Sequence, residues 1–219
     1  MKKLITTLAT LVLLTSASYS FDRPALSIGG SSTAAYFEAA AHEVENNEKS
    51  QKEEGAALGG YVSVFGELTF ADKLTVGIAY VPEDLETETV TRSRADKTTT
   101  ATASTVTQTI KAQLEDMTTA YIAFNLTDNF YVKFGQVNMD LITKETLGTG
   151  AAYGNADLDG DVYGAGYQMT MDNGVFLRAE AMRVKIGGIS LTSTNNTDNK
   201  IVLDDVDGVN ASISLGKTF

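Results

Sequence analysis

The chain has 219 residues and a formal net charge of -11, and it contains no cysteine. The lack of cysteine excludes a disulfide framework, a thiol nucleophile and a cysteine metal site. The negative charge argues against a nucleic-acid partner, because phosphate backbones repel an acidic protein. Hydrophobic residues make up 43% of the chain, a value that does not separate a soluble domain from a membrane-spanning β-structure.

The first twenty residues have the pattern of a secretory signal peptide. Lys2 and Lys3 precede an apolar run from Leu4 to Leu14, and small residues follow up to Ser20. The run is too short to cross a bilayer as a helix, and no later stretch is long and apolar enough to do so. We therefore expect residues 1–20 to direct export through the Sec pathway and residues 21–219 to form one exported domain.

Beyond residue 20 the chain repeats one plan of strand, short turn, strand and long polar loop. Apolar and polar residues alternate within each strand, as in a strand with one apolar and one polar face. Tight turns are predicted at 71–73, 127–129 and 172–174. Long loops are predicted at 42–54, 83–104, 147–157 and 191–200. This plan predicts eight strands, or ten if the threonine-rich part of the second loop contains a hairpin.

The last segment, 209–219, has the clearest alternation. Its apolar face consists of Val209, Ala211, Ile213, Leu215 and Phe219, and its other face carries small polar residues and glycine. Since the apolar face continues to the terminal Phe219, something apolar must cover it. This segment resembles the closing strand of bacterial outer-membrane β-barrels.

The whole exported region resembles the small OmpA-, OmpX- and opacity-type outer-membrane barrels, which have an even number of strands with short turns at one end and long loops at the other. The predicted fold is all-β, a transmembrane, antiparallel, up-and-down β-barrel. The resemblance implies the outer membrane of a Gram-negative bacterium, with lipid and lipopolysaccharide as neighbours. It also implies that the barrel assembly machinery recognises the chain end, with Phe219, Leu215 and Ile213 as the assembly signal.

Four ionisable residues fall on the small, polar face of their strands and so are predicted to point into the lumen: Glu67, Lys133, Arg178 and Glu180. Side chains fill the interior of an eight-stranded barrel, and buried ions need partners. The first three lie at similar distances from the tight turns, so we expect them to share one layer. They form either a packed salt-bridge plug or, alternatively, an ion pathway.

Other candidate sites are weaker. His42 is the only histidine, and it has no serine motif beside it, so we interpret it as a loop residue. Two carboxylate clusters, 157–161 and 204–207, are interpreted as an acidic rim, with weak divalent-cation binding as the alternative. Arg183 and Lys185 lie on the lipid-facing side of their strand, where they could contact lipopolysaccharide phosphates or extend to the interface.

The sequence therefore favours a structural or surface-interaction role, in envelope integrity or adhesion. The alternative is a narrow, porin-like channel for small solutes or ions. No catalytic constellation is evident, so we expect no enzyme activity, no cofactor and no metal.

Overall fold

The structure, a computed structural model, describes residues 24–45, 48–49, 53–86, 90–96, 104–146, 152–194 and 197–219. The strands are β1 (Ala25–Glu45), β2 (Glu48–Lys49), β3 (Glu53–Phe70), β4 (Leu74–Tyr80), β5 (Leu85–Glu86), β6 (Val90–Asp96), β7 (Ser104–Asn125), β8 (Phe130–Thr146), β9 (Ala156–Thr170), β10 (Val175–Ile186), β11 (Ile189–Thr192), β12 (Lys200–Leu203) and β13 (Val206–Thr218). No helix in these ranges is long and apolar enough to cross a membrane. The predicted signal peptide lies outside the described residues.

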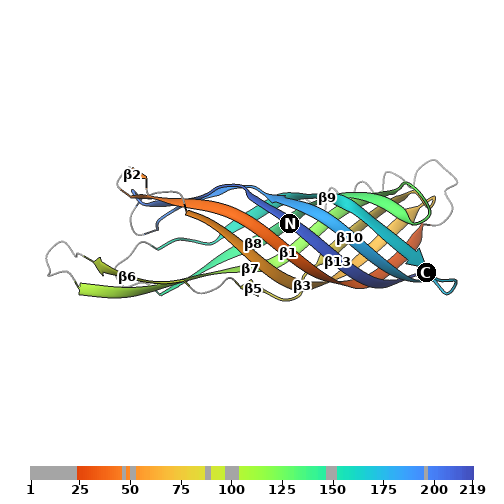
Figure 1. Cartoon of the computed structure of the whole chain (residues 1–219), viewed down its shortest axis with the longest axis horizontal. Helices are drawn as coiled ribbons and strands as arrows, with labels where there is room; N and C mark the ends of the chain where they lie inside the picture. The colour runs from red at the N-terminus through yellow and green to blue at the C-terminus, as the bar shows by residue number, and fades with distance from the viewer. Residues whose placement is uncertain are drawn as a thin grey trace.

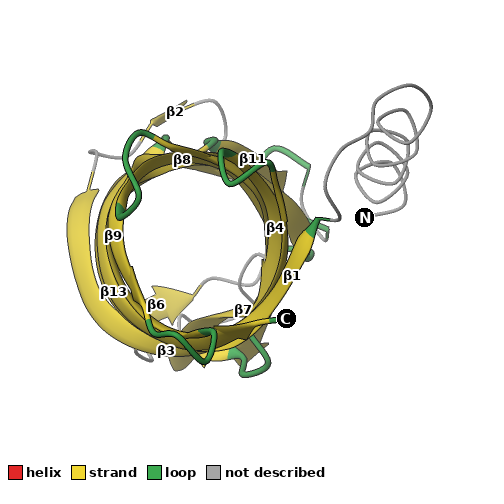
Figure 2. Cartoon of the chain, turned by 90° about the vertical axis from the view of Figure 1, so that its right-hand side faces the viewer, coloured by secondary structure: helices red, strands yellow, loops and turns green. Residues whose placement is uncertain are grey.

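The principal strands form a closed, antiparallel, 8-stranded barrel of β1, β3, β4, β7, β8, β9, β10 and β13. Neighbours in the ring follow the chain order, and β1 closes the ring by pairing with β3 on one side and β13 on the other. Figure 2 shows the closed ring end-on, and Figure 1 shows the strands inclined to the long axis. The predicted all-β, up-and-down barrel of eight strands is confirmed.

The threonine-rich segment does contain a hairpin, but it adds no strand to the barrel. β6 pairs with the first residues of β7, and β5 pairs with β7 further along. Both therefore continue the line of β4 beside β7. The alternative of ten barrel strands is excluded, and the segment predicted as the loop 83–104 contains β5, β6 and the first residue of β7, because the hydrogen-bonded ladder continues beyond the barrel.

The other predicted loops are also shorter than expected. β1 runs to Glu45, β2 covers Glu48–Lys49 and β3 begins at Glu53, so all of the described residues of 42–54 lie in strands. The 191–200 loop is flanked by a hairpin of β11 and β12, and β9 takes the last residues of 147–157. Cross-strand hydrogen bonding explains these differences, because strand propensity depends on the neighbouring strand more than on the residue itself.

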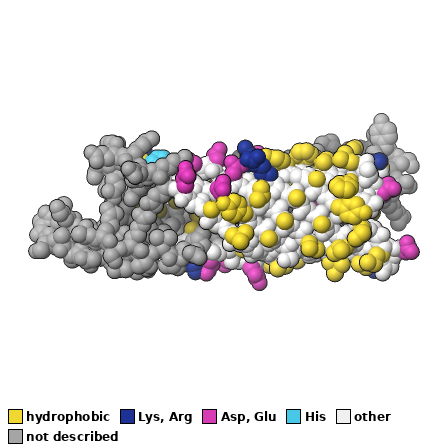
Figure 3. Space-filling view, in the orientation of Figure 1, with side chains coloured by type: hydrophobic (Ala, Val, Ile, Leu, Met, Phe, Trp, Pro, Cys, Tyr) yellow, Lys and Arg dark blue, Asp and Glu magenta, His cyan; other side chains and the backbone are white. Residues whose placement is uncertain are grey.

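The outer wall carries a band of exposed apolar side chains. On β1 the band runs from Leu26 to Tyr36, with both side chains exposed, and on β13 it runs from Phe219 to Val209. A tilted strand of about 9–11 residues crosses a bilayer, and each of these stretches has that length. Figure 3 shows the apolar band, with acidic and basic side chains gathered at its border toward the loop end.

The inner wall holds large aromatic rings directly over glycines of the neighbouring strand. Gly77 pairs with Tyr121, and Gly166 pairs with Tyr131. A Cβ atom on either glycine would overlap the tyrosine ring. The glycines therefore let both rings lie against the wall, and this close approach determines where the tyrosine hydroxyls point in the lumen.

Candidate functional site

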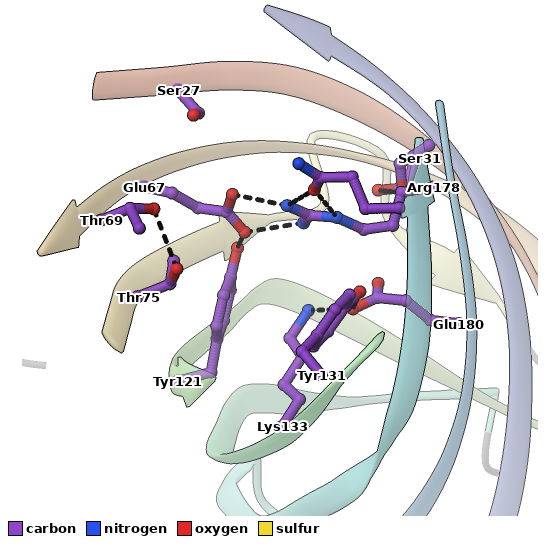
Figure 4. A network of polar contacts seen from close by, with 12 residues as sticks. Ser27, Ser31, Glu67, Thr69, Thr75, Tyr121, Tyr131, Lys133, Arg178 and Glu180 are labelled. Carbon is purple, nitrogen blue, oxygen red and sulfur yellow. Dashed lines mark hydrogen bonds and ion pairs between the residues drawn. The ribbon is translucent and has the colours of Figure 1, made fainter. Parts of the chain in front are cut away.

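The four predicted lumen ions come from three strands and point into the barrel in its turn-side half. Glu67 lies on β3, Lys133 on β8, and Arg178 and Glu180 on β10. Figure 4 shows them converging with Tyr121 and Tyr131. Alternation explains the inward direction, since their neighbours in sequence on the same strands face outward.

The first pair joins Arg178 to Glu67. Arg178 Nη1 donates to Glu67 Oε1 and Nη2 donates to Oε2, each over 2.7 Å. This is a bidentate pair, the geometry that gives arginine and carboxylate their strongest interaction. Tyr121 donates its hydroxyl to Glu67 Oε1 over 2.6 Å, and Gln168 Oε1 accepts from Arg178 Nε and Nη2 over 3.0 and 2.8 Å. The charges of this pair thus have several partners each.

The second pair joins Lys133 to Glu180. Lys133 Nζ donates to Glu180 Oε1 over 2.9 Å, and Tyr131 donates its hydroxyl to the same oxygen over 2.6 Å. Ser212 donates to Glu180 Oε2 over 3.4 Å. Lys133 Nζ also lies 3.8 Å from the centre of the Tyr121 ring, close enough for a cation–π interaction. Tyr121 therefore contacts both ion pairs.

Both pairs are nearly closed to solvent. The side chains of Arg178 and Glu67 are 7% and 3% exposed, and those of Lys133 and Glu180 are 12% and 7% exposed. Two acidic and two basic groups balance in charge, as buried ions must. Phe65 and Phe176 lie beside the Arg178 guanidinium and are themselves buried. We call this set of side chains the ion layer.

The lumen differs on the two sides of the ion layer. Toward the tight turns there is a cavity of about 580 Å³ lined by polar residues such as Thr69, Thr75 and Asn125. Toward the loops the space shrinks to about 80 Å³. Beyond it the lumen is filled by a cluster of buried apolar side chains: Val81, Met117, Val137, Met139, Leu158, Val184 and Ile186. An ionic barrier and an apolar barrier thus lie in series.

Sequence reasoning found the four ions but not the neutral groups that bind them. Tyr121, Tyr131 and Gln168 carry half of the hydrogen bonds at the site. Their inward parity is visible in the sequence. However, the sequence does not show that Tyr121 lies over Gly77 and Tyr131 over Gly166. These positions depend on the register between neighbouring strands.

Arg183 and Lys185 lie on the outer wall of β10, exposed, at the border of the apolar band. Arg183 Nη2 donates to Asp207 Oδ1 over 2.9 Å, and Lys185 is opposite Asp207 on β13 and Asp161 on β9. Their predicted contact with lipopolysaccharide remains a prediction. Since Asp207 already neutralises Arg183, a phosphate group would have to compete with that carboxylate.

The remaining candidates are placed as follows. Ile213, Leu215 and Phe219 face outward and are more than half exposed, and their role as an assembly signal remains a prediction. His42 is in β1, opposite Val202 of β12, so its placement in an irregular loop was wrong. The acidic 157–161 run lies within β9 rather than in a loop, and no group of three His, Asp or Glu residues in the described ranges could hold a metal ion.

Neither a protein-family model nor a curated protein sequence matches this chain. Solved structures do. The outer membrane protein OprG from Pseudomonas aeruginosa is 13% identical, with a TM-score of 0.51 over 90% of this chain and 96% of that one. The outer membrane protein AlkL is 11% identical, with a TM-score of 0.50 over 92% and 93%.

The chain has the fold of the small outer-membrane β-barrels. The outer membrane protease OmpT from Escherichia coli is 9% identical, with a TM-score of 0.44 over 93% of this chain and 100% of that one. That likeness is too distant to support an inference about enzyme activity. The comparisons therefore establish the architecture, and the function has to be argued from the lumen and the outer surface.

Proposed function

We propose that the protein spans the outer membrane of a Gram-negative bacterium as a closed, non-conducting barrel that presents an ordered surface outside the cell. The strand lengths carry this proposal. β1 and β7 have 21 and 22 residues, whereas about 9–11 residues suffice to cross the bilayer. Half of each strand is therefore available to form a platform in water, above the charged border of the apolar band.

The closed lumen supports a role in interaction over one in ion conduction. An ion would have to displace two buried, neutralised pairs and then pass an apolar cluster whose Val137 is fully buried. Planar-bilayer recordings should show no steady conductance for the purified protein. A steady conductance that changes in selectivity with Arg178→Ala would instead establish an ion channel.

The platform can be tested by shortening it. We propose replacing residues 87–110 with a short Gly-Ser loop, which removes β6 and the part of β7 that pairs with it. Strains that lack the protein would be complemented with either form and compared for adhesion to matrix-coated surfaces. The shortened barrel should assemble in normal yield and fail to restore adhesion. Full restoration of adhesion by the shortened barrel would show that adhesion does not depend on the platform.

A second candidate is the passage of small apolar molecules through the side of the barrel. Two observations favour it: the inner wall of the loop-side half is apolar, and β3 extends beyond the last residue of β4 with which it pairs. Faster transfer of a fluorescent hydrocarbon into vesicles that contain the protein would support this function. Equal rates of hydrocarbon transfer with and without the protein would rule out this second function.

A further inference from the structure

The lipid-facing wall of the barrel has a groove near the end that carries the tight turns. The groove measures about 600 Å³ and crosses β10, β13, β1 and β3. Figure 1 shows β10, β13 and β1 side by side, with the C-terminus at the same end. The lining side chains that face outward are Ile28, Val64, Val175, Leu215 and Lys217. Four of them are apolar and one is a cation, so we call this feature the lysine groove.

Two glycines explain why the wall is hollow here. Gly30 lies opposite Leu215 and Val64, and Gly66 lies opposite Ile28. Both glycines share the outward face of these apolar residues, because paired residues and residues two positions apart point the same way. A Cβ atom at Gly66 would meet nothing within 4 Å, and one at Gly30 would make only an ordinary contact. Glycine inside a strand often marks a close approach by a ligand, and here the open side faces the membrane.

The register inclines the lysine groove from the membrane border into the apolar band. Val175 pairs with Lys217, Lys217 pairs with Ile28, and Ile28 pairs with Gly66. Val175 is the first residue of β10, and Lys217 is next to last in β13. Ile28 is the fourth residue of β1, and Gly66 is the fifth from the end of β3. The line through these positions therefore begins at the depth of the lipid headgroups and continues into the hydrocarbon.

Lys217 places a positive charge where the groove begins. The side chain is exposed, and no ion pair of the described residues includes it. Its Nζ lies 5.2 Å from the centre of the Phe219 ring, which favours an ammonium near the last residue of the chain. A lysine stem packs along apolar surface while its ammonium stays at the membrane border. There the ammonium is a point charge suited to a phosphate.

An anionic phospholipid suits this arrangement better than three other occupants. A second copy of the chain, related by a two-fold axis, would bring two Lys217 ammonium groups into one interface, and like charges repel. Lipopolysaccharide would lie at the loop end, since the short turns of outer-membrane barrels face the periplasm. A zwitterionic headgroup carries its own cation, so it gains less from a lysine than an anionic headgroup does.

From these observations we propose that the lysine groove binds an anionic glycerophospholipid of the periplasmic leaflet. The phosphate lies on the Lys217 ammonium, and one acyl chain follows Ile28, Leu215 and Val64 over the hollow at Gly30. This inference goes beyond the proposed function, because it concerns the opposite end of the barrel and requires neither the closed lumen nor the platform. Failure of one therefore leaves the other standing.

The test uses the full barrel refolded into phosphatidylcholine vesicles. Since the chain contains no Trp, a single introduced Trp reports its own lipid neighbours. Leu177→Trp places the reporter opposite Leu215, and Phe134→Trp places a control reporter on the outer wall of β8. Brominated phosphatidylglycerol and brominated phosphatidylcholine, which quench Trp on contact, are compared at equal content. We expect a preference for phosphatidylglycerol of about fivefold at Leu177→Trp, the effect of one lysine near the membrane surface, and none at Phe134→Trp.

Four variants, each combined with Leu177→Trp, assign the site. Lys217→Gln should abolish the preference, whereas Lys217→Arg should keep it, because only the second retains the charge. Gly30→Leu fills the hollow and should also abolish the preference. Ala34→Leu is its matched control, since it adds the same side chain on the same face of β1, and it should leave the preference unchanged. Circular dichroism checks that each variant has folded.

Several results would overturn the inference. One is an equal response of Leu177→Trp to the two brominated lipids. Another is a preference that survives Lys217→Gln, which would mean that the charge of Lys217 does not select the lipid. Equal effects of Gly30→Leu and Ala34→Leu would show that the hollow holds no acyl chain. Weak quenching of Leu177→Trp by both lipids would show that a second copy of the chain covers the groove instead.

Discussion

Two arginines on β10, five positions apart, make ion pairs of nearly equal length in opposite surroundings. Arg178 faces the lumen and meets Glu67 over 2.7 Å, with side chains 7% and 3% exposed. Arg183 faces outward and meets Asp207 over 2.9 Å, with side chains 51% and 49% exposed. Judged by distance alone, the two ion pairs would be expected to contribute equally to stability. Their difference in solvation predicts that the first maintains the barrel and that the second contributes little to its stability.

The largest expected effect comes from Arg178→Ala. The substitution leaves Glu67 as a buried charge without its bidentate partner, which costs about 3–5 kcal/mol when the site is dry. Urea unfolding in lipid vesicles measures this loss. The double variant Glu67→Ala with Arg178→Ala is the control, and it should recover much of the stability because no unpaired charge remains. An unchanged urea midpoint for Arg178→Ala would mean that the lumen is wet.

A smaller loss is expected from Gly77→Ala. The new Cβ overlaps the Tyr121 ring, so the ring must move and its hydroxyl must leave Glu67. Overpacking of this kind costs about 1–3 kcal/mol. The same unfolding assay applies, with Gly66→Ala as the matched control, because an added Cβ at Gly66 meets nothing within 4 Å. Equal effects of the two substitutions would contradict the role of Gly77 in seating the ring.

Arg183→Ala should have almost no effect on stability. Exposed ion pairs contribute about 0–1 kcal/mol, and the Asp207 side chain is already 49% exposed, so its charge stays hydrated when the arginine is removed. Its urea midpoint should therefore match that of the unmodified protein within error. A loss as large as that of Arg178→Ala would mean that the outer pair is shielded by lipid.

The smallest effect concerns Glu86 of β5, which accepts a hydrogen bond from Lys111 of β7 above the apolar band. The neighbouring ammonium lowers the pKa of the Glu86 carboxyl. A lowered pKa contributes stability above the ordinary carboxyl range, and this contribution is lost only when the pH falls through the lowered value. NMR titration of Lys111→Met should show the Glu86 pKa rising back toward its usual range, with no measurable change in the urea midpoint at neutral pH. An unchanged Glu86 pKa would show that Lys111 is not its partner.

The sequence by itself determined the barrel and the direction of its side chains. Alternation is a local property with a period of two residues, so Glu67, Lys133, Arg178 and Glu180 could be assigned to the lumen, and Ile213 and Leu215 to the outer wall, before any pairing was known. The tight turns at 71–73 and 172–174 were local as well, since each depends on a few consecutive residues.

Only the tertiary structure decided which charges meet. Arg178 and Glu67 are 111 positions apart, and their pairing depends on the register of every strand between them and on the closure of β1 with β13. The same holds for Gly77 beneath Tyr121. It also holds for the end of the β3–β4 ladder at Val64, where Pro82 matters only because the register would place it opposite Val62. Register is a relation between distant segments, and no local pattern in the chain specifies it.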